Sequence, residues 1–357
     1  MVTESLGGKS RGDFGVALSY LMALQLYLHM FELIKIATIS LAFASVACSP
    51  PSTSADADAR ASSSVASIPP RVEAISFLGD TLTAPEQPEG VRAVYMERYK
   101  EAERALAVAP TNVDSLIWMG RRTAYLGHYR DAIDVYSAAI GMHPEDARLY
   151  RHRGHRYLSV RESGKAIADL ERAAELTKGR RDEVEPDGLP NSLNIPTSTL
   201  QFNIWYHLAL AHYVAGDFEA ALDAQRSCMK VSVHPDSVAA TAYWMYMTMR
   251  RLGLRDEAQE LLDSIDEGME IIESAAYLDL LLLFKGERSF EDLIGPNGDA
   301  PNLQSTTTSY GLGVWHLLND RSDDAHELWE RILEGRNQWS AFGYISAEGE
   351  LARSAVR

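Results

Sequence analysis

Cysteine is scarce in this sequence, because a chain of 357 residues contains only two. Two cysteines are too few for a disulfide framework. Positive charge is also in deficit: 34 Lys and Arg face 50 Asp and Glu, which gives a formal net charge of −16 at pH 7. Phosphate contacts require a basic surface, so this balance argues against general nucleic-acid binding. Apolar residues make up 46% of the chain, which is enough for a continuous core.

Sequence signatures of catalysis are missing as well. The chain has no Gly-x-Ser-x-Gly motif, phosphate-binding loop, dinucleotide-binding glycine series or kinase signature. His152 and His155 stand three residues apart, but no third or fourth ligand is near them, and their arginine neighbours would repel a metal ion. We therefore expect no metal, no cofactor and no enzymatic activity.

The clearest pattern is a tandem repeat over residues 113–180. Two copies of a 34-residue unit follow each other, with small residues at the eighth, twentieth and twenty-seventh places and large apolar residues at the fourth and twenty-fourth. Small side chains allow two helices to cross closely, and large ones fill the spaces between them. The recurring small residues are Gly120 and Gly154, Ala132 and Ala166, and Ala139 and Ala173.

This unit resembles the tetratricopeptide repeat, a helix–turn–helix motif of the same length. The resemblance implies an all-α fold, a right-handed α-solenoid over residues 72–357. Further copies begin near Phe202, Ala239, Ile272 and Thr306, and a capping helix is expected over 341–355. Residues 181–201, which contain three prolines, form an inserted loop.

Several local expectations accompany this register. Gly127 should adopt a positive φ in the turn of the first copy, whereas Arg161 at the same place of the second copy indicates a different turn. We expect an opening helix after Arg71. Cys228 falls at a small-residue place and should be a buried core thiol. Trp118 and Trp339 lie outside the core places and could mark a partner surface.

The resemblance also implies a binding strip, because such arrays line their concave groove with fixed places of each first helix. Some family members use cationic and Asn side chains there to hold the carboxylate terminus of a peptide. An alternative is that these arginines pair with acidic residues of neighbouring helices. The residues carried over as the peptide-binding groove are Arg121, Tyr125, Arg148, Arg151, His155, Asn203, Tyr206, Arg250 and Arg251.

The N-terminus resembles a bacterial lipoprotein signal peptide. An apolar run ends in small residues immediately before Cys48, which would become the lipidated residue after removal of 1–47. The start of translation could also be Met22 or Met30. A plain secretory signal and a membrane anchor are the alternatives. Residues 48–71 are rich in Ser, Ala and Pro, which is typical of a flexible tether.

Together these patterns favour a non-enzymatic protein–protein interaction scaffold of the bacterial cell envelope. We expect it to be lipid-anchored and to face the periplasm, or else to be soluble in the periplasm or secreted. The expected partner is a protein or peptide, acidic or with a free C-terminal carboxylate, and not a nucleic acid. One rival is an enzyme or small-ligand receptor whose pocket is closed by the loop 181–201, and another is a structural assembly subunit. A loop lying against Arg151 and His155 would favour the pocket.

Overall fold

The computed structural model describes residues 71–294 and 303–355, which belong to one unit, residues 71–357. The expected signal segment and Cys48 lie outside the described residues, and so does the expected tether up to residue 70. Among the described residues, no helix is both long and apolar enough to cross a membrane.

The described part begins with a β-hairpin. Strand β1 (Val72–Ile75) pairs antiparallel with β2 (Thr81–Thr83), and Gly79 adopts a φ of +92° in the turn between them. The expected opening helix is therefore wrong. β-Branched residues and a glycine turn favour a hairpin over a helix in so short a segment. Helix α2 (Glu89–Val108) follows.

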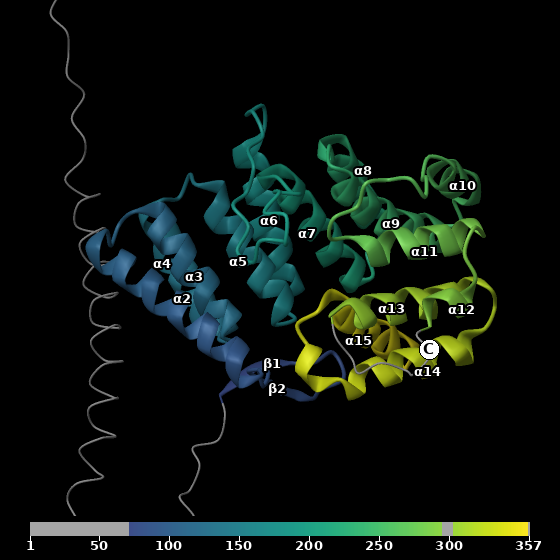
Figure 1. Cartoon of the computed structure of the whole chain (residues 1–357), viewed down its shortest axis with the longest axis horizontal. Helices are drawn as coiled ribbons and strands as arrows, with labels where there is room; N and C mark the ends of the chain where they lie inside the picture. Colours follow the sequence, from purple (N-terminus) through teal and green to yellow (C-terminus); the bar gives the residue numbers. More distant parts are fainter. Residues whose placement is uncertain (1–70, 295–302, 356–357) are drawn as a thin grey trace, which may run out of the picture. The chain divides into compact units, whose positions relative to one another are not determined.

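The rest of the described chain is a helical-repeat solenoid of helix–turn–helix pairs, as expected from the repeat (Figure 1). From α2 to α12, and again from α13 to α15, each helix contacts the next one along the chain. Most of these helices are joined by short connections, which fold neighbouring helices back on each other, whereas the inserted loop separates α6 from α7. The helices are α3 (Val113–Tyr125), α4 (Tyr129–Met142), α5 (Ala147–Ser159), α6 (Ser163–Thr177), α7 (Leu200–Ala215), α8 (Phe218–Val231), α9 (Pro235–Arg251), α10 (Arg255–Asp263), α11 (Ala275–Lys285), the short α12 (Phe290–Leu293), α13 (Leu303–Leu318), α14 (Ser322–Glu334) and α15 (Phe342–Ser354), with a 3₁₀ turn at Arg336–Gln338.

The helix crossings confirm the predicted register. A β-carbon added at Gly120 would overlap the ring of Tyr136, which stands at the large twenty-fourth place of the same copy. Gly154 lies against Leu170 in the same way, with 2.8 Å from an added β-carbon to Leu170 Cγ. Glycine at the eighth place is thus a packing requirement, since any side chain there would displace a buried neighbour.

The two tandem copies share one turn. Gly127 and Arg161 both have positive φ, +86° and +66° respectively. The amide after each donates to the carbonyl five residues back, from His128 to Thr123 and from Glu162 to Tyr157. The expectation of a different turn at Arg161 is therefore wrong. The backbone strain of a non-glycine residue in this region is offset by the buried contacts that the Arg161 side chain makes.

Helix α15 does more than cap the last pair, because it contacts α7 as well as α13 and α14. Trp339, just before it, is 2% exposed and packs edge-on against Tyr129, so its expected role in a partner surface is wrong. Trp118 is half-buried beneath the guanidinium groups of two arginines. Cys228 is a buried core thiol, as predicted, and burial raises its pKa to about 12.

Candidate functional site

The nine predicted groove residues all lie on the first helices of four successive pairs. Helix α3 carries Arg121 and Tyr125, and α9 carries Arg250 and Arg251. Between them, α5 and α7 carry the other five, which are Arg148, Arg151, His155, Asn203 and Tyr206. We call this set the first-helix strip. Most of its polar atoms are engaged by other parts of the same chain.

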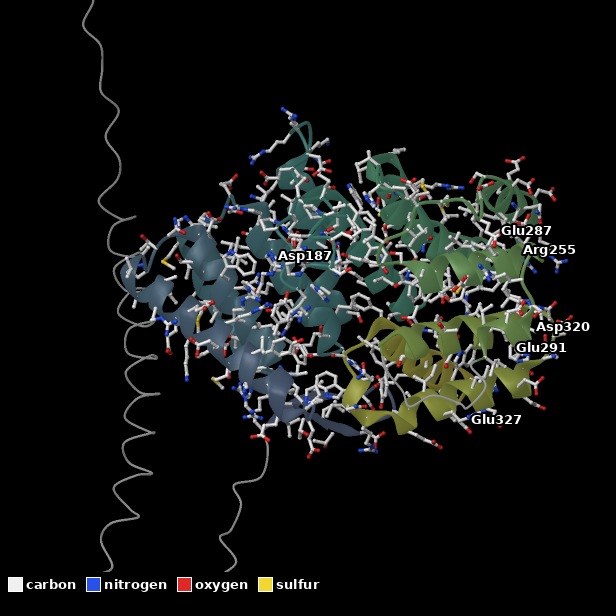
Figure 2. All side chains as sticks on the ribbon, in the orientation of Figure 1. Asp187, Arg255, Glu287, Glu291, Asp320 and Glu327 are labelled. Carbon is white, nitrogen blue, oxygen red and sulfur yellow. The ribbon has the colours of Figure 1, made fainter. Side chains whose placement is uncertain are left out.

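The inserted loop lies on the α3 part of the strip. Arg121 Nη1 donates to the carbonyl of Pro186 at 2.6 Å, and Arg122 Nη1 donates to the carbonyl of Gly188 at 2.9 Å. Gly188 packs so closely on Tyr125 that a β-carbon there would overlap the phenol oxygen. Asp187, labelled in Figure 2, stands between these two anchored residues. The loop therefore approaches α3 with its backbone.

On α5 the loop inserts a carboxylate. The guanidinium of Arg151 forms an ion pair with Glu185, 2.9 Å between Nε and Oε2, and both side chains are under 10% exposed. Arg151 Nη1 also donates to His152 Nδ1 at 3.0 Å. Burial raises the pKa of Glu185 and lowers that of Arg151, so desolvation opposes the charged form of each partner.

Aromatic and histidine rings fill the next part of the strip. The ring centroids of His155 and His207 lie 4.2 Å apart, and Phe342 at the start of α15 is tilted against His155 and edge-on to His207. His207 Nδ1 and the carbonyl of Asn203 are 2.5 Å apart, which fixes the proton on that nitrogen. Burial lowers the pKa of both histidines well below 6.5, so they are neutral at pH 7.

Asn203 and Tyr206 on α7 also have partners within the chain. The amide of Asn203 donates to Ser198 Oγ in the loop at 3.0 Å. The hydroxyl of Tyr206 accepts from Trp244 Nε1 at 3.0 Å and lies 3.0 Å from the hydroxyl of Tyr277. Burial raises the pKa of Tyr206 well above 10. Tyr206 thus joins α7, α9 and α11.

At the α9 end, helix α15 supplies the counter-charge. Arg251 forms an ion pair with Glu350, 2.6 Å between Nη2 and Oε1, and donates from Nε to the hydroxyl of Tyr213 at 3.1 Å. Arg250 donates to the hydroxyl of Tyr246 on its own helix at 2.6 Å.

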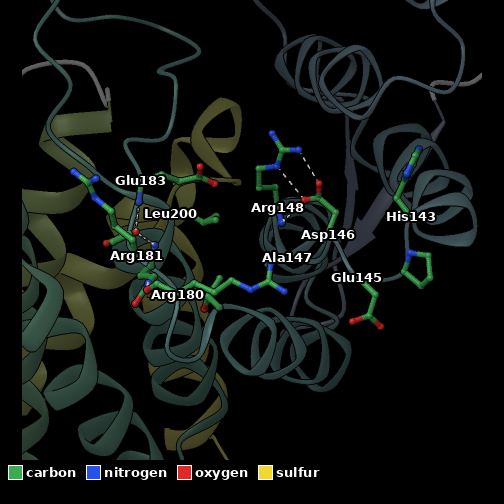
Figure 3. A pocket seen from close by; sticks show the side chains of 13 residues that line it. His143, Glu145, Asp146, Ala147, Arg148, Arg180, Arg181, Glu183 and Leu200 are labelled. Carbon is green, nitrogen blue, oxygen red and sulfur yellow. Dashed lines mark hydrogen bonds and ion pairs between the residues drawn. The ribbon is translucent and has the colours of Figure 1, made fainter. Parts of the chain in front are cut away.

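Arg148 stands apart from the loop contacts. It pairs with Asp146 at the start of its own helix, 2.7 Å between Nη2 and Oδ2, and with Asp114 of α3, 2.8 Å between Nη1 and Oδ1. It also lines a cavity of about 600 Å³ between the start of α5 and the two ends of the loop (Figure 3). Arginines and carboxylates both line this cavity, and Figure 3 shows the pairing of Arg148 with Asp146.

The structure thus places four of the predicted residues together under the loop: Arg121, Tyr125, Arg151 and Asn203. Arg251 instead pairs with Glu350 of α15, and Arg148 pairs with Asp146 and Asp114. The expected alternative, pairing with acids of neighbouring helices, holds for Arg148. Of the two residues expected beneath a pocket-closing loop, Arg151 pairs with the loop, whereas the ring of His155 lies against His207 and Phe342. However, Glu185 itself occupies the position facing Arg151 that a small anion would take.

Sequence reasoning did not find the acidic partners. Glu185 and Glu350 lie 34 and 99 residues from the arginines that they hold, so no local spacing connects them. Arg122, which binds the loop, is not among the predicted groove residues because its repeat place is not one that lines the groove. The cluster of acidic residues around Glu185 is the sequence feature that could have indicated that the loop pairs with the arginines of the strip.

Within residues 71–294 and 303–355, no three His, Cys, Asp or Glu side chains are grouped so that they could hold a metal ion.

Comparison with known proteins finds similarity to solved structures only. No protein-family model matches the sequence, and no curated protein matches it significantly. A crystal structure of MamA is similar, with 20% identity, 49% of this chain and 91% of that chain covered, and a TM-score of 0.37. YrrB, described as a TPR protein with an unusual peptide-binding site, is 13% identical, with 71% of this chain and 97% of that chain covered and a TM-score of 0.38. Yeast Tom70 is 13% identical, with 76% of this chain and 62% of that chain covered and a TM-score of 0.35. Because these TM-scores are below 0.5, the fold assignment rests on the helix pairs described above.

Proposed function

We propose that this chain is a non-enzymatic protein–protein interaction scaffold that binds a carboxylate-bearing protein or peptide on its first-helix strip. The observation that carries the proposal is the pairing of Arg151 with Glu185 and of Arg251 with Glu350. In both, the carboxylate comes from a segment outside the helix pair of the arginine. A guanidinium fork suits any carboxylate, whether an acidic side chain or a chain terminus.

We also propose that the chain is anchored at the bacterial cell envelope by a lipid on Cys48, facing the periplasm. The support is the sequence: an apolar run, small residues before the cysteine, and a Ser-, Ala- and Pro-rich tether after it. Expression of the full chain and of Cys48→Ala tests this. A lipid mass on the mature N-terminal peptide and recovery with membranes are expected for the parent alone. An unmodified N-terminus in both would refute the anchor.

Site-directed crosslinking in the native host tests the binding proposal. A photoreactive phenylalanine analogue replaces Tyr125 in the strip, and a control replaces Asp223 on α8, whose side chain is 82% exposed. We expect a protein adduct of discrete mass from position 125, lost when Arg121→Glu is added to the same chain. Identical adducts from positions 125 and 223, or none from 125, would contradict the proposal. The helical circular dichroism signal of each variant serves as the folding control.

A further inference from the structure

Residues 185–188 of the inserted loop contact the first-helix strip as a bound peptide would. Three of its four residues are anchored in order: the Glu185 carboxylate at Arg151, the Pro186 carbonyl at Arg121, and the Gly188 carbonyl at Arg122. Only a residue without a side chain fits against Tyr125 at the last place. The contacts therefore specify a short pattern, Glu-x-x-Gly, which is recognised through one carboxylate and two backbone carbonyl oxygens.

The loop is held by polar contacts and not by burial of apolar surface. Its large aliphatic side chains face the solvent, with Val184 58%, Leu189 45%, Leu193 61% and Ile195 44% exposed. Segments with few buried apolar contacts open locally at low free-energy cost. The loop thus lacks the hydrophobic attachment that would make it a permanent part of the core.

The buried ion pair does not lock the loop either. Removing two charges from water costs about as much as their attraction returns, so a buried pair contributes little net stability when both partners can be resolvated together. Loop release separates Arg151 and Glu185 and returns both to water. Release is therefore much less costly than mutation of one partner in place, which would leave the other charge buried and unpaired.

We propose that the loop is an internal, displaceable ligand, and that the external partner is an extended acidic segment carrying the same Glu-x-x-Gly pattern. The proposal rests on the proposed function and adds the chemistry of the partner and its regulation. Because the loop is tethered, it competes at an effective concentration on the order of millimolar. If the loop stretch itself binds the open strip with an intrinsic dissociation constant of about 10 µM, an external segment binds the intact chain on the order of 100-fold more weakly than the open strip.

Most of the loop can be replaced by a short turn, because its two ends lie side by side. Val184 and Thr199 form an isolated antiparallel bridge, with Leu200 N donating to Glu183 O at 2.9 Å. Residues 185–198 can therefore be replaced by Thr-Asn-Gly-Thr, whose Asn-Gly pair forms the tight turn that closes two antiparallel strands. The variant keeps every helix and uncovers Arg121, Arg122 and Arg151.

The test is a fluorescence-anisotropy titration with a labelled peptide of residues 181–190, RDEVEPDGLP. We expect saturable binding to the loop-shortened chain and binding on the order of 100-fold weaker to the intact chain. A peptide with Gln in place of the glutamate at 185 should bind the shortened chain at least about 10-fold more weakly. Equal affinity for the intact and shortened chains, or no binding to a folded shortened chain, would overturn the inference.

A second variant tests the same inference if the loop-shortened chain does not fold. If the shortened chain does not fold, Glu185→Gln in the full chain takes its place, since it removes the carboxylate and keeps the loop. We then expect tighter peptide binding than by the parent, and unchanged affinity would overturn the inference. A crosslinked partner at position 125 without peptide binding would refute the internal ligand alone. Absence of both would refute the scaffold proposal as well.

Discussion

At the scale of single residues, the helix crossings of the two tandem copies leave no space for a methyl group at the eighth repeat place. Gly120 lies against the ring of Tyr136, which is 1% exposed and cannot move outward. Gly164, in contrast, has nothing within 4 Å of an added β-carbon. These two helical glycines form a matched pair for testing the packing.

We predict that Gly120→Ala lowers the free energy of unfolding by about 1–3 kcal/mol through overpacking, and that Gly120→Leu prevents folding. Gly164→Ala should raise the free energy of unfolding by about 0.5–1 kcal/mol, because alanine favours the helix. Urea denaturation followed by circular dichroism measures both. Equal effects at the two positions would mean that the crossing at Gly120 is not tight.

Buried histidines make stability depend on pH. His207 is 4% exposed, and burial followed by the charge of Arg151 lowers its pKa well below 6.5. Below pH 6.5 the unfolded chain therefore binds more protons than the folded chain, so stability falls as the pH falls. The loss approaches about 1.4 kcal/mol per pH unit for each such histidine.

We predict that His207→Gln flattens the decline in stability between pH 7 and pH 5. Glutamine is uncharged and its amide can still donate a hydrogen bond to the carbonyl of Asn203. His143→Gln is the control, since His143 contacts the carbonyl of Thr111 at the edge of the array. Thermal melts at half-unit pH steps provide the measurement. An unchanged slope for His207→Gln would show that this histidine does not contribute.

At the scale of elements, helix α15 is tied to the turn between α5 and α6. Glu348 accepts from Arg161 Nε at 2.9 Å and Nη2 at 2.7 Å, and both side chains are at most 2% exposed. Glu348 also accepts from the amide of Phe77, in the turn of the hairpin. One carboxylate thus joins the last helix to the hairpin segment and to the second tandem copy.

We predict that Glu348→Gln costs about 3–5 kcal/mol of unfolding free energy, because Arg161 is left buried without its counter-charge. Glu327→Gln on α14, at a side chain that is 72% exposed, should change stability by less than about 0.5 kcal/mol. Chemical denaturation compares the two. A cost below 1 kcal/mol at Glu348 would mean that the attachment of α15 does not depend on this pair.

Local spacing explains which elements the sequence could predict. The helices of the tandem copies follow from the 34-residue pattern, and α15 lies within the range 341–355 where a capping helix is expected. The hairpin at Val72–Thr83 has strands of only four and three residues, too short for a clear period. The contact of Arg161 with Glu348 spans 187 residues and has no periodic trace.

At the scale of the whole described unit, the chain covers its own first-helix strip with the inserted loop and α15. Repeat places predict which side chains lie on the strip, but not the acids that reach it from remote segments, since those acids belong to no repeat. Binding of a partner at Arg121 and Arg151 then requires the loop to leave.

Hydrogen exchange of the intact chain tests that claim most directly. The amide of Leu200 donates to Glu183 O, and that of Glu185 donates to Ser198 O, within the bridge that closes the loop. With millimolar RDEVEPDGLP peptide, we predict faster exchange at residues 185–198 and unchanged exchange in α15. Unchanged exchange of the loop at saturating peptide, or protection confined to another surface, would contradict the account.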